Sequence, residues 1–403
     1  MHVDVHPSLA GGPVSHDMLG GLPPELAFPK DEYTDRVRRI REGMREHGLD
    51  VLLVQHPSSV TYVSGFQSFA MNNGETVILP KDDEPSLIVH GPEVGGALLH
   101  SPFDNILAYP PGTGFESYVA GQLSAKGFGK ARVGVEMRSF GVSAAAYASL
   151  RDALPDAELV DASGVVDAVR FIKSSREIEH IQQAARFTDA GMTAAIGAAA
   201  EGQRDNDVAA AAYHAMATAG SDYLCHCVVA TTGRRSGILH STYKRNEIRA
   251  GDPILLEMGG CYHRYTSPMM RSVSIGEPSA EVSRTMDACL KALGNVLSTI
   301  KPGVTAHEVA EAGWQAIDES GPGLVTHGNF GYGVGLGFPP TWADWTGKIE
   351  LGVQTVLRPG MVFHHPVALR KLGEFAVTVS ETSVVTKDGP RTFGTVERKM
   401  FVK

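Results

Sequence analysis

Two short apolar segments, the first with a carboxylate inside it, constrain the fold more than any other part of this sequence. Residues 253–258 and 270–275 have the length and alternation of β-strands, and Gly259 and Gly260 predict a turn between them. Glu257 lies within the first apolar run, where a carboxylate is costly unless it is paired, protonated or bound to a cation. We therefore expect antiparallel strands here, with a functional site on them.

The rest of the chain divides into a part in which short strands and helices alternate and a part with longer helices. We expect an irregular arm over residues 1–28, an α/β domain over 29–173 and a catalytic domain over 174–403. The spacing of apolar residues over 31–48 predicts an amphipathic helix, and residues 51–54 predict a buried strand. Helix pairs followed by antiparallel strands occur twice in the C-terminal part, which predicts an α+β domain.

Charge and cysteine content argue against several classes of protein. The chain has 403 residues and a net charge of −9, which disfavours nucleic acid or an anionic membrane as a partner. Its 4 cysteines are too few for a disulfide framework, so we expect reduced thiols. On an extended segment, Cys225 and Cys227 would share one face and His226 would point to the other. Neither face then carries enough ligands for a soft-metal site. We find no signal peptide and no apolar run of about 18 residues, and expect a cytoplasmic protein.

Three motifs in the C-terminal part resemble those of the creatinase/prolidase family, which includes the methionine aminopeptidases. The family's strand ending in Asp-Met-Gly appears as Glu-Met-Gly at residues 257–259. Its Gly-x-Gly-His-Gly-Ile-Gly segment appears at 331–337, and its Pro-Gly-Met-Val-Phe strand at 359–363. The resemblance implies the pita-bread fold, with a curved antiparallel sheet in the catalytic domain. It also implies a homodimer in which residues 64–74, with the relatives' contacts near Met71 and Asn73, reach over the neighbour's site; a plain surface loop is an equal alternative for this segment.

The resemblance also locates the positions at which metal-dependent members hold two divalent ions with two Asp, one His and two Glu. These positions fall on Glu257, Pro268, Val334, Pro366 or His365, and Ser380 or Glu381. Proline and valine offer no side-chain lone pair to a hard cation, so most of the ligand set is lost. The resemblance therefore implies the metal-independent branch that contains creatinase and ectoine hydrolase, with no cofactor. Residues 337–342, Gly-Phe-Pro-Pro-Thr-Trp, are similar to a segment of ectoine-hydrolase-like relatives.

Candidate catalytic residues follow from proton chemistry and from the same matches. His240, in a loop before the hairpin, matches the family's mechanistic histidine, and an imidazole exchanges protons near neutral pH. Glu257 is a candidate general base or orienting carboxylate, with a pKa raised by its apolar strand unless a cation lies close. His364 and His365 are neighbours on one strand, so only one can face the site, and the sequence leaves both open. Glu381 completes the set.

Candidate binding residues lie on the same strands and beside the glycine-rich segment. Arg271 is expected to pair with Glu257, either within the site or as a buried structural salt bridge, and Tyr265 to hydrogen-bond substrate or an oxyanion. His327 and nearby aromatic side chains predict a wall for a flat or zwitterionic ligand, although aromatic residues are also common in cores. The full set of binding candidates is Tyr265, Arg271, His327, Phe330, Tyr332, Trp342 and Met71.

These residues support three hypotheses. The first is a hydrolase that cleaves a C–N bond, in an amide or amidine, of a small nitrogenous metabolite resembling ectoine or creatine. It would use histidine and carboxylate acid–base catalysis without metal. The second is a metal-dependent Xaa-Pro dipeptidase or aminopeptidase with a rearranged site. The third is a small-molecule-binding protein that keeps the fold without the chemistry.

Overall fold

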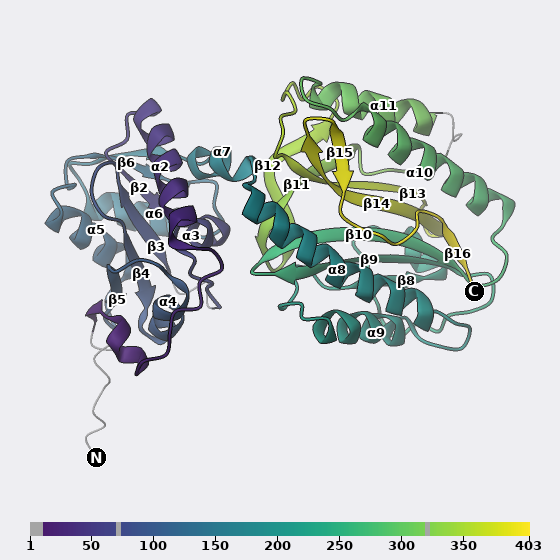
Figure 1. The fold of residues 1–403 in the computed structure, drawn as a ribbon, viewed down its shortest axis with the longest axis horizontal. Coiled ribbons are helices and arrows are strands. Elements are labelled where there is room, and N and C mark those ends of the chain that lie inside the picture. The colour runs from purple at the N-terminus through teal and green to yellow at the C-terminus, as the bar shows by residue number, and fades with distance from the viewer. Residues whose placement is uncertain (1–10, 70–73, 319–322) are drawn as a thin grey trace, which may run out of the picture. The chain divides into compact units, whose positions relative to one another are not determined.

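The computed structural model of the chain describes residues 11–69, 74–318 and 323–403. It divides into two compact units, Met1–Arg170 and Phe171–Lys403, whose elements are labelled in Figure 1. The division falls at Arg170, close to the boundary expected after residue 173. Within the described ranges, no helix is both long enough and apolar enough to cross a bilayer.

The N-terminal unit is built on a seven-stranded sheet with the order β1-β5-β4-β3-β2-β6-β7. Its strands are β1 (Gly12–Val14), β2 (Val51–Val54), β3 (Thr76–Pro80), β4 (Ser86–His90), β5 (Ile106–Tyr109), β6 (Arg132–Val135) and β7 (Glu158–Asp161). Its helices are α2 (Lys30–Glu46), α3 (Pro57–Ser64), α4 (Val94–His100), α5 (Phe115–Ala125), α6 (Ala144–Ala153) and α7 (Val165–Phe171), the last of which crosses the division between the units. Both parallel and antiparallel pairs occur, as in an α/β layer domain.

Strand β2 shows why the centre of this sheet is apolar at every position. Leu52 and Val54 pack in one core with residues of α2 and α3, whereas Val51 and Leu53 pack in a second core with residues of α5 and α6. Helices thus cover both faces, and a strand buried on both faces has no polar side (Figure 1). The sequence-based prediction of a strand at residues 51–54 is confirmed.

Part of the expected N-terminal arm is ordered structure. Strand β1 pairs antiparallel with β5, with Gly12 opposite Ala108, and extends one edge of the sheet. A short 3-10 helix, η1 (His16–Leu19), follows it. The prediction of an irregular arm was therefore wrong for β1 and η1, while residues 1–10 lie outside the described part of the chain.

The C-terminal unit contains a nine-stranded sheet with the order β15-β14-β13-β11-β10-β9-β8, in which β12 pairs with β11 and β16 with β10. Its strands are β8 (Val229–Thr232), β9 (Pro253–Tyr262), β10 (Tyr265–Ser274), β11 (Asn329–Phe338), β12 (Thr341–Glu350), β13 (Val362–Lys371), β14 (Phe375–Thr386), β15 (Gly389–Thr392) and β16 (Met400–Val402). The helices are α8 (Ser175–Ala198), α9 (Asp205–Thr218), α10 (Ala280–Thr299) and α11 (Ala306–Asp318), with a 3-10 turn, η4 (Gly233–Gly237). The two helix pairs, each followed by antiparallel strands, appear in Figure 1 as predicted.

The β9–β10 hairpin is longer than expected because its glycines do not form the turn. The turn residues are His263 and Arg264, both with left-handed φ values of 47° and 68°. Gly260 lies within β9, where a Cβ atom would approach Phe187 of α8 to 2.6 Å. The prediction of a turn at Gly259 and Gly260 was wrong, because the glycine at 260 serves close packing of strand against helix.

Strand alternation separates a face that packs on helices from a face that carries polar residues. Leu256 and Met258 of β9 pack in a core with α8 and α9. Glu257 points the other way, and its register partners are Met270 on β10 and Val229 on β8. Residues Val229, Leu255, Met270, Ala368 and Ala376 form one apolar cluster on that second face. Because this cluster joins β8–β10 to β13–β14, Glu257 faces the same space as His364 and Arg370 of β13.

Candidate functional site

The polar face of the C-terminal sheet gathers a cluster of titratable side chains around Glu257. Strands β9, β11, β12, β13 and β14 supply it, together with the segments that precede β8 and β11. Hydrogen bonds, ring contacts and charge interactions connect its members, which are His226, Glu257, His327, Tyr332, Trp342, His364, Arg370 and Ser380. We refer to these eight residues as the Glu257 cluster.

A line of hydrogen bonds runs through the cluster from Trp342 to Ser380. Trp342 Nε1–H donates to the Tyr332 hydroxyl at 2.9 Å, and this hydroxyl lies 2.8 Å from His364 Nδ1. His364 Nε2 lies 2.7 Å from the Ser380 hydroxyl, which also accepts the Met270 backbone N–H at 2.7 Å. Both ring nitrogens of His364 are therefore engaged by hydroxyl groups. This holds the imidazole at a fixed angle on β13.

Burial sets the protonation states of the cluster. It raises the pKa of Glu257 to about 7, and the nearby positive charges of His226 and Arg370 offset only part of this rise. Burial also holds the pKa of His364 well below 6.5 and raises that of the Tyr332 hydroxyl far above 10. Near neutral pH the cluster thus contains a neutral imidazole, a protonated phenol and a carboxyl group that readily gains or loses its proton.

A buried guanidinium lies at the end of β13. Arg370 is 3% exposed, its Nη2 lies 3.2 Å from His327 Nε2, and its Nε has no hydrogen-bond partner within the described ranges. Burial, together with the charges of Arg370 and His240, lowers the pKa of His327 to about 4. His327 is therefore neutral and accepts a hydrogen bond from Arg370. Sequence analysis did not single out Arg370, because no local motif surrounds it.

Arg271 and Glu381, both expected in the site, pair with each other on the helix-facing side of the sheet. Arg271 Nη2 donates to Glu381 Oε1 at 2.7 Å, and the two side chains are 0% and 1% exposed. Arg398 also donates to Glu381. The structure differs from the expected Glu257–Arg271 pair because Met270, not Arg271, lies opposite Glu257, and successive strand residues point to opposite faces.

Three further candidates also lie on the helix-facing side. His365 lies 3.0 Å from the Phe330 carbonyl oxygen and 2.9 Å from the Ser383 hydroxyl, so it bonds away from His364. Phe330 packs edge-on against Trp314 of α11 in the apolar core. The Tyr265 hydroxyl donates to Glu177 at the start of α8. Of the two adjacent histidines, His364 is the one that faces the Glu257 cluster.

The remaining candidates lie in loops. His240 is exposed, has a left-handed φ of 55°, and lies close enough to His327 for its charge to lower that pKa. Met71 and Asn73 lie outside the described residues, so the structure gives them no position.

His226 belongs to the cluster although sequence analysis gave it no role there. Its ring lies 4.6 Å from the Trp342 ring, and its charge acts on Glu257. His226 Nδ1 lies 2.8 Å from the Cys227 carbonyl oxygen, which can only accept, so Nδ1–H donates this hydrogen bond. The segment from 221 to 228 is not a strand, and Cys225 is buried while Cys227 is exposed. The expectation that both thiols share a strand face was therefore wrong.

The donor set around Glu257 does not suit a pair of divalent metal ions. Hard cations require several oxygen ligands, and here Glu257 is accompanied by imidazoles, hydroxyls and the Arg370 cation. His364 has no free ring nitrogen to offer. Among the residues that the structure describes, no three His, Cys, Asp or Glu side chains are grouped to hold a metal ion. Tyr332, which shares a face of β11 with Val334, provides the polar group of that strand.

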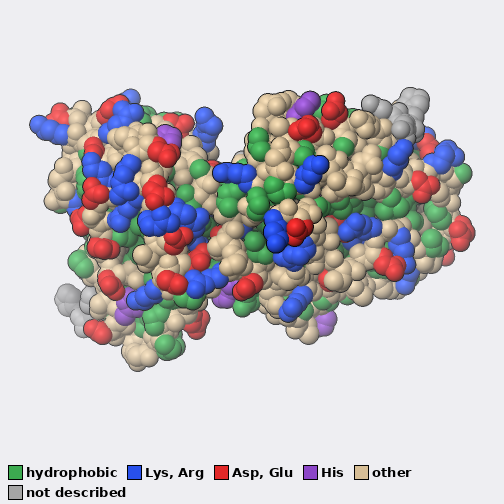
Figure 2. Space-filling model, turned by 45° about the horizontal axis from the view of Figure 1, so that its top comes forward, with side chains coloured by type: hydrophobic (Ala, Val, Ile, Leu, Met, Phe, Trp, Pro, Cys, Tyr) green, Lys and Arg blue, Asp and Glu red, His purple; other side chains and the backbone are tan. Residues whose placement is uncertain are grey.

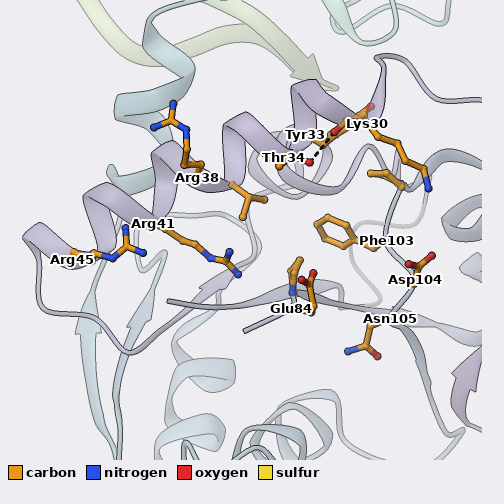
Figure 3. A pocket seen from close by; sticks show the side chains of 13 residues that line it. Lys30, Tyr33, Thr34, Arg38, Arg41, Arg45, Glu84, Phe103, Asp104 and Asn105 are labelled. Atoms are coloured by element: carbon orange, nitrogen blue, oxygen red, sulfur yellow. Dashed lines mark hydrogen bonds between the residues drawn. The ribbon is translucent and has the colours of Figure 1, made fainter. Parts of the chain in front are cut away.

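A cavity of about 710 Å³ lies in the N-terminal unit, and none of its lining residues belongs to the Glu257 cluster. Arg38, Arg41 and Arg45 extend from α2 along one side of it, with Glu84 and Phe103 across from them (Figure 3). Arg38 already pairs with Asp35 and Glu42. The face of each unit in Figure 2 likewise shows Lys and Arg side chains interspersed with Asp and Glu. We find no reason to place catalysis at this cavity.

Comparison with known proteins places the chain in a family. Residues 179–387 match the model of metallopeptidase family M24, and residues 36–172 match the creatinase/prolidase N-terminal domain. The ectoine hydrolase of Halomonas elongata is 30% identical over 399 residues, covering 94% of this chain and 99% of that protein. The Xaa-Pro dipeptidase of Pyrococcus horikoshii is 26% identical over 379 residues, covering 92% of this chain and all of that protein.

A solved structure shows the same fold. The X-Pro aminopeptidase of Thermotoga maritima superposes with a TM-score of 0.81 at 22% identity, over 91% of this chain and 99% of that one. The α/β N-terminal domain and the pita-bread C-terminal domain that the sequence predicted are thereby confirmed. The chain belongs to metallopeptidase family M24, with a creatinase/prolidase N-terminal domain, and is a hydrolase of that family.

Proposed function

We propose that this enzyme hydrolyses a C–N bond of a small nitrogenous metabolite, of the ectoine or creatine type, by acid–base catalysis without metal. One observation carries the proposal. Glu257 has a pKa near 7 and is surrounded by imidazole, hydroxyl and guanidinium groups instead of the further carboxylates that a pair of divalent ions needs. The similarity to the Halomonas elongata ectoine hydrolase over nearly the whole of both chains supports the same conclusion.

Hydrolysis of a C–N bond needs one proton removed from water and one delivered to the leaving nitrogen. In our proposal the ionised Glu257 takes the proton from water, since its pKa near 7 leaves a useful fraction ionised at neutral pH. The protonated carboxyl, or the His226 imidazole beside it, then donates to the leaving nitrogen. The Tyr332 hydroxyl, held by Trp342 and His364, is placed to hydrogen-bond the oxyanion that forms between these steps.

In this proposal Arg370 selects the substrate by binding its carboxylate. Its buried guanidinium leaves Nε without a partner among the described residues, and a carboxylate is the group that a guanidinium binds best. Ectoine and creatine both carry a carboxylate beside a nitrogen-rich group. In this proposal the packed rings of His226 and Trp342 lie beside the nitrogen-bearing end of such a ligand.

His240 remains a candidate proton carrier on the strength of the family resemblance. It is exposed, whereas His226 is half-buried beside Trp342 and acts directly on Glu257. Comparing His240→Ala with His226→Asn separates the two. Substitution of the histidine that transfers protons should lower kcat and remove one limb of the pH–rate profile, while calorimetry still detects substrate binding.

The experiment that tests the function is a substrate panel of ectoine, hydroxyectoine, creatine and Gly-Pro or Ala-Pro dipeptides, run with metal removed and then restored. We expect turnover of an ectoine- or creatine-type compound in the metal-free state, and loss of that turnover in Glu257→Gln with the ligand still bound. Cleavage of the prolyl dipeptides only after metal is restored would establish the dipeptidase instead. Binding without turnover of any compound would establish a non-catalytic binding protein.

The homodimer that the family resemblance implies remains a prediction. Light scattering coupled to size-exclusion chromatography measures the molar mass directly and distinguishes one chain from two.

A further inference from the structure

Two cysteines that are far apart in the sequence meet beside a buried arginine. Cys225, in the segment before β8, places its Sγ 3.1 Å from the Sγ of Cys261 in β9. Arg264, in the turn between β9 and β10, donates from Nη2 to Cys225 Sγ at 3.1 Å. Both thiols and the Arg264 side chain are completely buried. None of these three residues belongs to the Glu257 cluster.

The arginine has no carboxylate partner among the described residues. Its other hydrogen bonds go to the carbonyl oxygens of Tyr223, at 2.6 Å, and Gly337, at 3.0 Å. Its guanidinium also lies over the Tyr223 ring, 3.8 Å from the centroid. A fully buried guanidinium is costly without negative charge close to it, and the Asp222 carboxylate acts on Arg264 without forming a hydrogen bond to it in the described part of the chain. Of the groups to which the guanidinium donates a hydrogen bond, the Cys225 thiol is the one that can ionise.

Electrostatics makes Cys225, rather than Cys261, the first thiol of the pair to ionise. Burial alone would raise the pKa of Cys225, but the hydrogen bond from Cys261 and the charge of Arg264 bring it below the ordinary value. Burial and the neighbouring Cys225 raise the pKa of Cys261 well above its ordinary value. When Cys225 ionises, its sulfur can accept hydrogen bonds from the Cys261 thiol and the Arg264 guanidinium.

We propose that Cys225 and Cys261 form a reversible oxidation site, in which the Cys225 thiolate reacts first and Cys261 closes a disulfide. With hydrogen peroxide as oxidant, the thiolate sulfur attacks one peroxide oxygen and the O–O bond breaks. Cys225 becomes a sulfenic acid, and the released hydroxide takes up a proton to form water. The Cys261 sulfur then attacks the sulfenic sulfur, the S–O bond breaks, and a second water leaves. The two sulfurs lose two electrons and the peroxide gains them.

The geometry fits this step. A disulfide needs about 2.05 Å between the sulfurs, so the observed contact has to shorten by only about 1 Å. The segment from 221 to 228 that carries Cys225 is irregular, so it can move without breaking a strand. The remaining thiols lack such a neighbour: Cys289 is buried against the Val377 carbonyl oxygen, and Cys227 is exposed beside His226.

Oxidation would reach the Glu257 cluster through neighbouring residues. His226 follows Cys225 directly in the chain, and its ring packs on Trp342. Cys225 Sγ also contacts the carbonyl oxygen of Gly337 at 3.1 Å, near the end of β11, just before the β12 strand that carries Trp342. Closing the disulfide releases Arg264 from its thiolate and moves the segment that holds His226. The site is therefore a modification site that adjoins the catalytic face.

The experiment treats the purified full-length protein with hydrogen peroxide, blocks free thiols with an alkylating agent, and maps cross-linked peptides by mass spectrometry. We expect a Cys225–Cys261 cross-link that dithiothreitol reverses, both in the wild type and in Cys289→Ser, the matched control that removes a buried but isolated thiol. In Cys261→Ser the sulfenic acid on Cys225 should persist and be trapped by dimedone. Circular dichroism of each variant confirms that it is folded.

Hydrogen exchange of the reduced and oxidised wild type adds a measurement that needs no variant. We expect faster exchange in residues 221–228 and in β12 after oxidation, with α2 of the N-terminal unit unchanged. Failure of the folded wild type to form the cross-link, with both thiols recovered reduced, would overturn the proposal. So would oxidation that stops at Cys227 or Cys289. The outcome does not depend on which substrate the enzyme hydrolyses.

Discussion

Glu257→Gln provides the sharpest test of the Glu257 cluster because its effect on stability depends on pH. The Glu257 pKa is 4.5 without its surroundings and about 7 in the fold. Between these values the unfolded chain releases the proton while the folded chain keeps it. Stability that is present below pH 4.5 is therefore lost as pH rises through 7. At about 1.4 kcal/mol per pKa unit the full effect is about 3 kcal/mol, and about 2 kcal/mol remains after allowing for solvent screening of a partly exposed side chain.

The assay is urea unfolding of wild type and Glu257→Gln at about pH 5 and about pH 8. We expect the wild type to lose about 2 kcal/mol more free energy of unfolding over this interval than the variant, because glutamine does not titrate. Glu247→Gln, an exposed change in the preceding loop, is the control and should follow the wild type. Parallel pH dependence in wild type and Glu257→Gln would refute a raised pKa, and with it the proposed proton transfer by Glu257.

Three further substitutions separate structural from functional residues. Glu381→Gln leaves Arg271 buried without its charge partner and should lower the free energy of unfolding in urea by about 3–5 kcal/mol. The control Glu374→Gln, at an exposed position, should lower it by less than about 0.5 kcal/mol. Equal effects of the two substitutions would contradict the structural role of Glu381. Arg370→Gln should raise KM at least tenfold for a carboxylate-bearing substrate and change kcat less, and an unchanged KM would exclude it as the carboxylate contact. Tyr332→Phe removes the hydroxyl between Trp342 and His364 and should lower kcat about tenfold or more with KM nearly constant, so a normal kcat would exclude the oxyanion role.

Local patterns in the sequence predicted the elements well where one physical cause dominates. The apolar run at residues 51–54 is β2 because both faces of that strand are covered, and the spacing over 31–48 became α2 (Lys30–Glu46). Alternation also correctly limited the adjacent histidines, His364 and His365, to opposite faces. Choosing between them required the register of β13 against β11, which places Tyr332 opposite His364.

Where sequence reasoning failed, the cause was non-local. The glycine at 260 signalled a turn, but its actual requirement is close approach to Phe187 of α8. Arg271 appeared to be the partner of Glu257, but a shift of one residue in register places it on the other face with Glu381. Arg370 carries no local motif, the pattern around His226 pointed only to its neighbouring cysteines, and only the folding of the sheet brings both residues to Glu257.

The most direct test of metal-independent catalysis by the Glu257 cluster is turnover of an ectoine- or creatine-type substrate by chelator-treated enzyme whose metal content is measured by elemental analysis. We predict full activity with far less than one transition-metal ion per chain and no increase when manganese, cobalt or zinc is restored. Activity that disappears with the chelator and returns in proportion to bound metal would contradict the account.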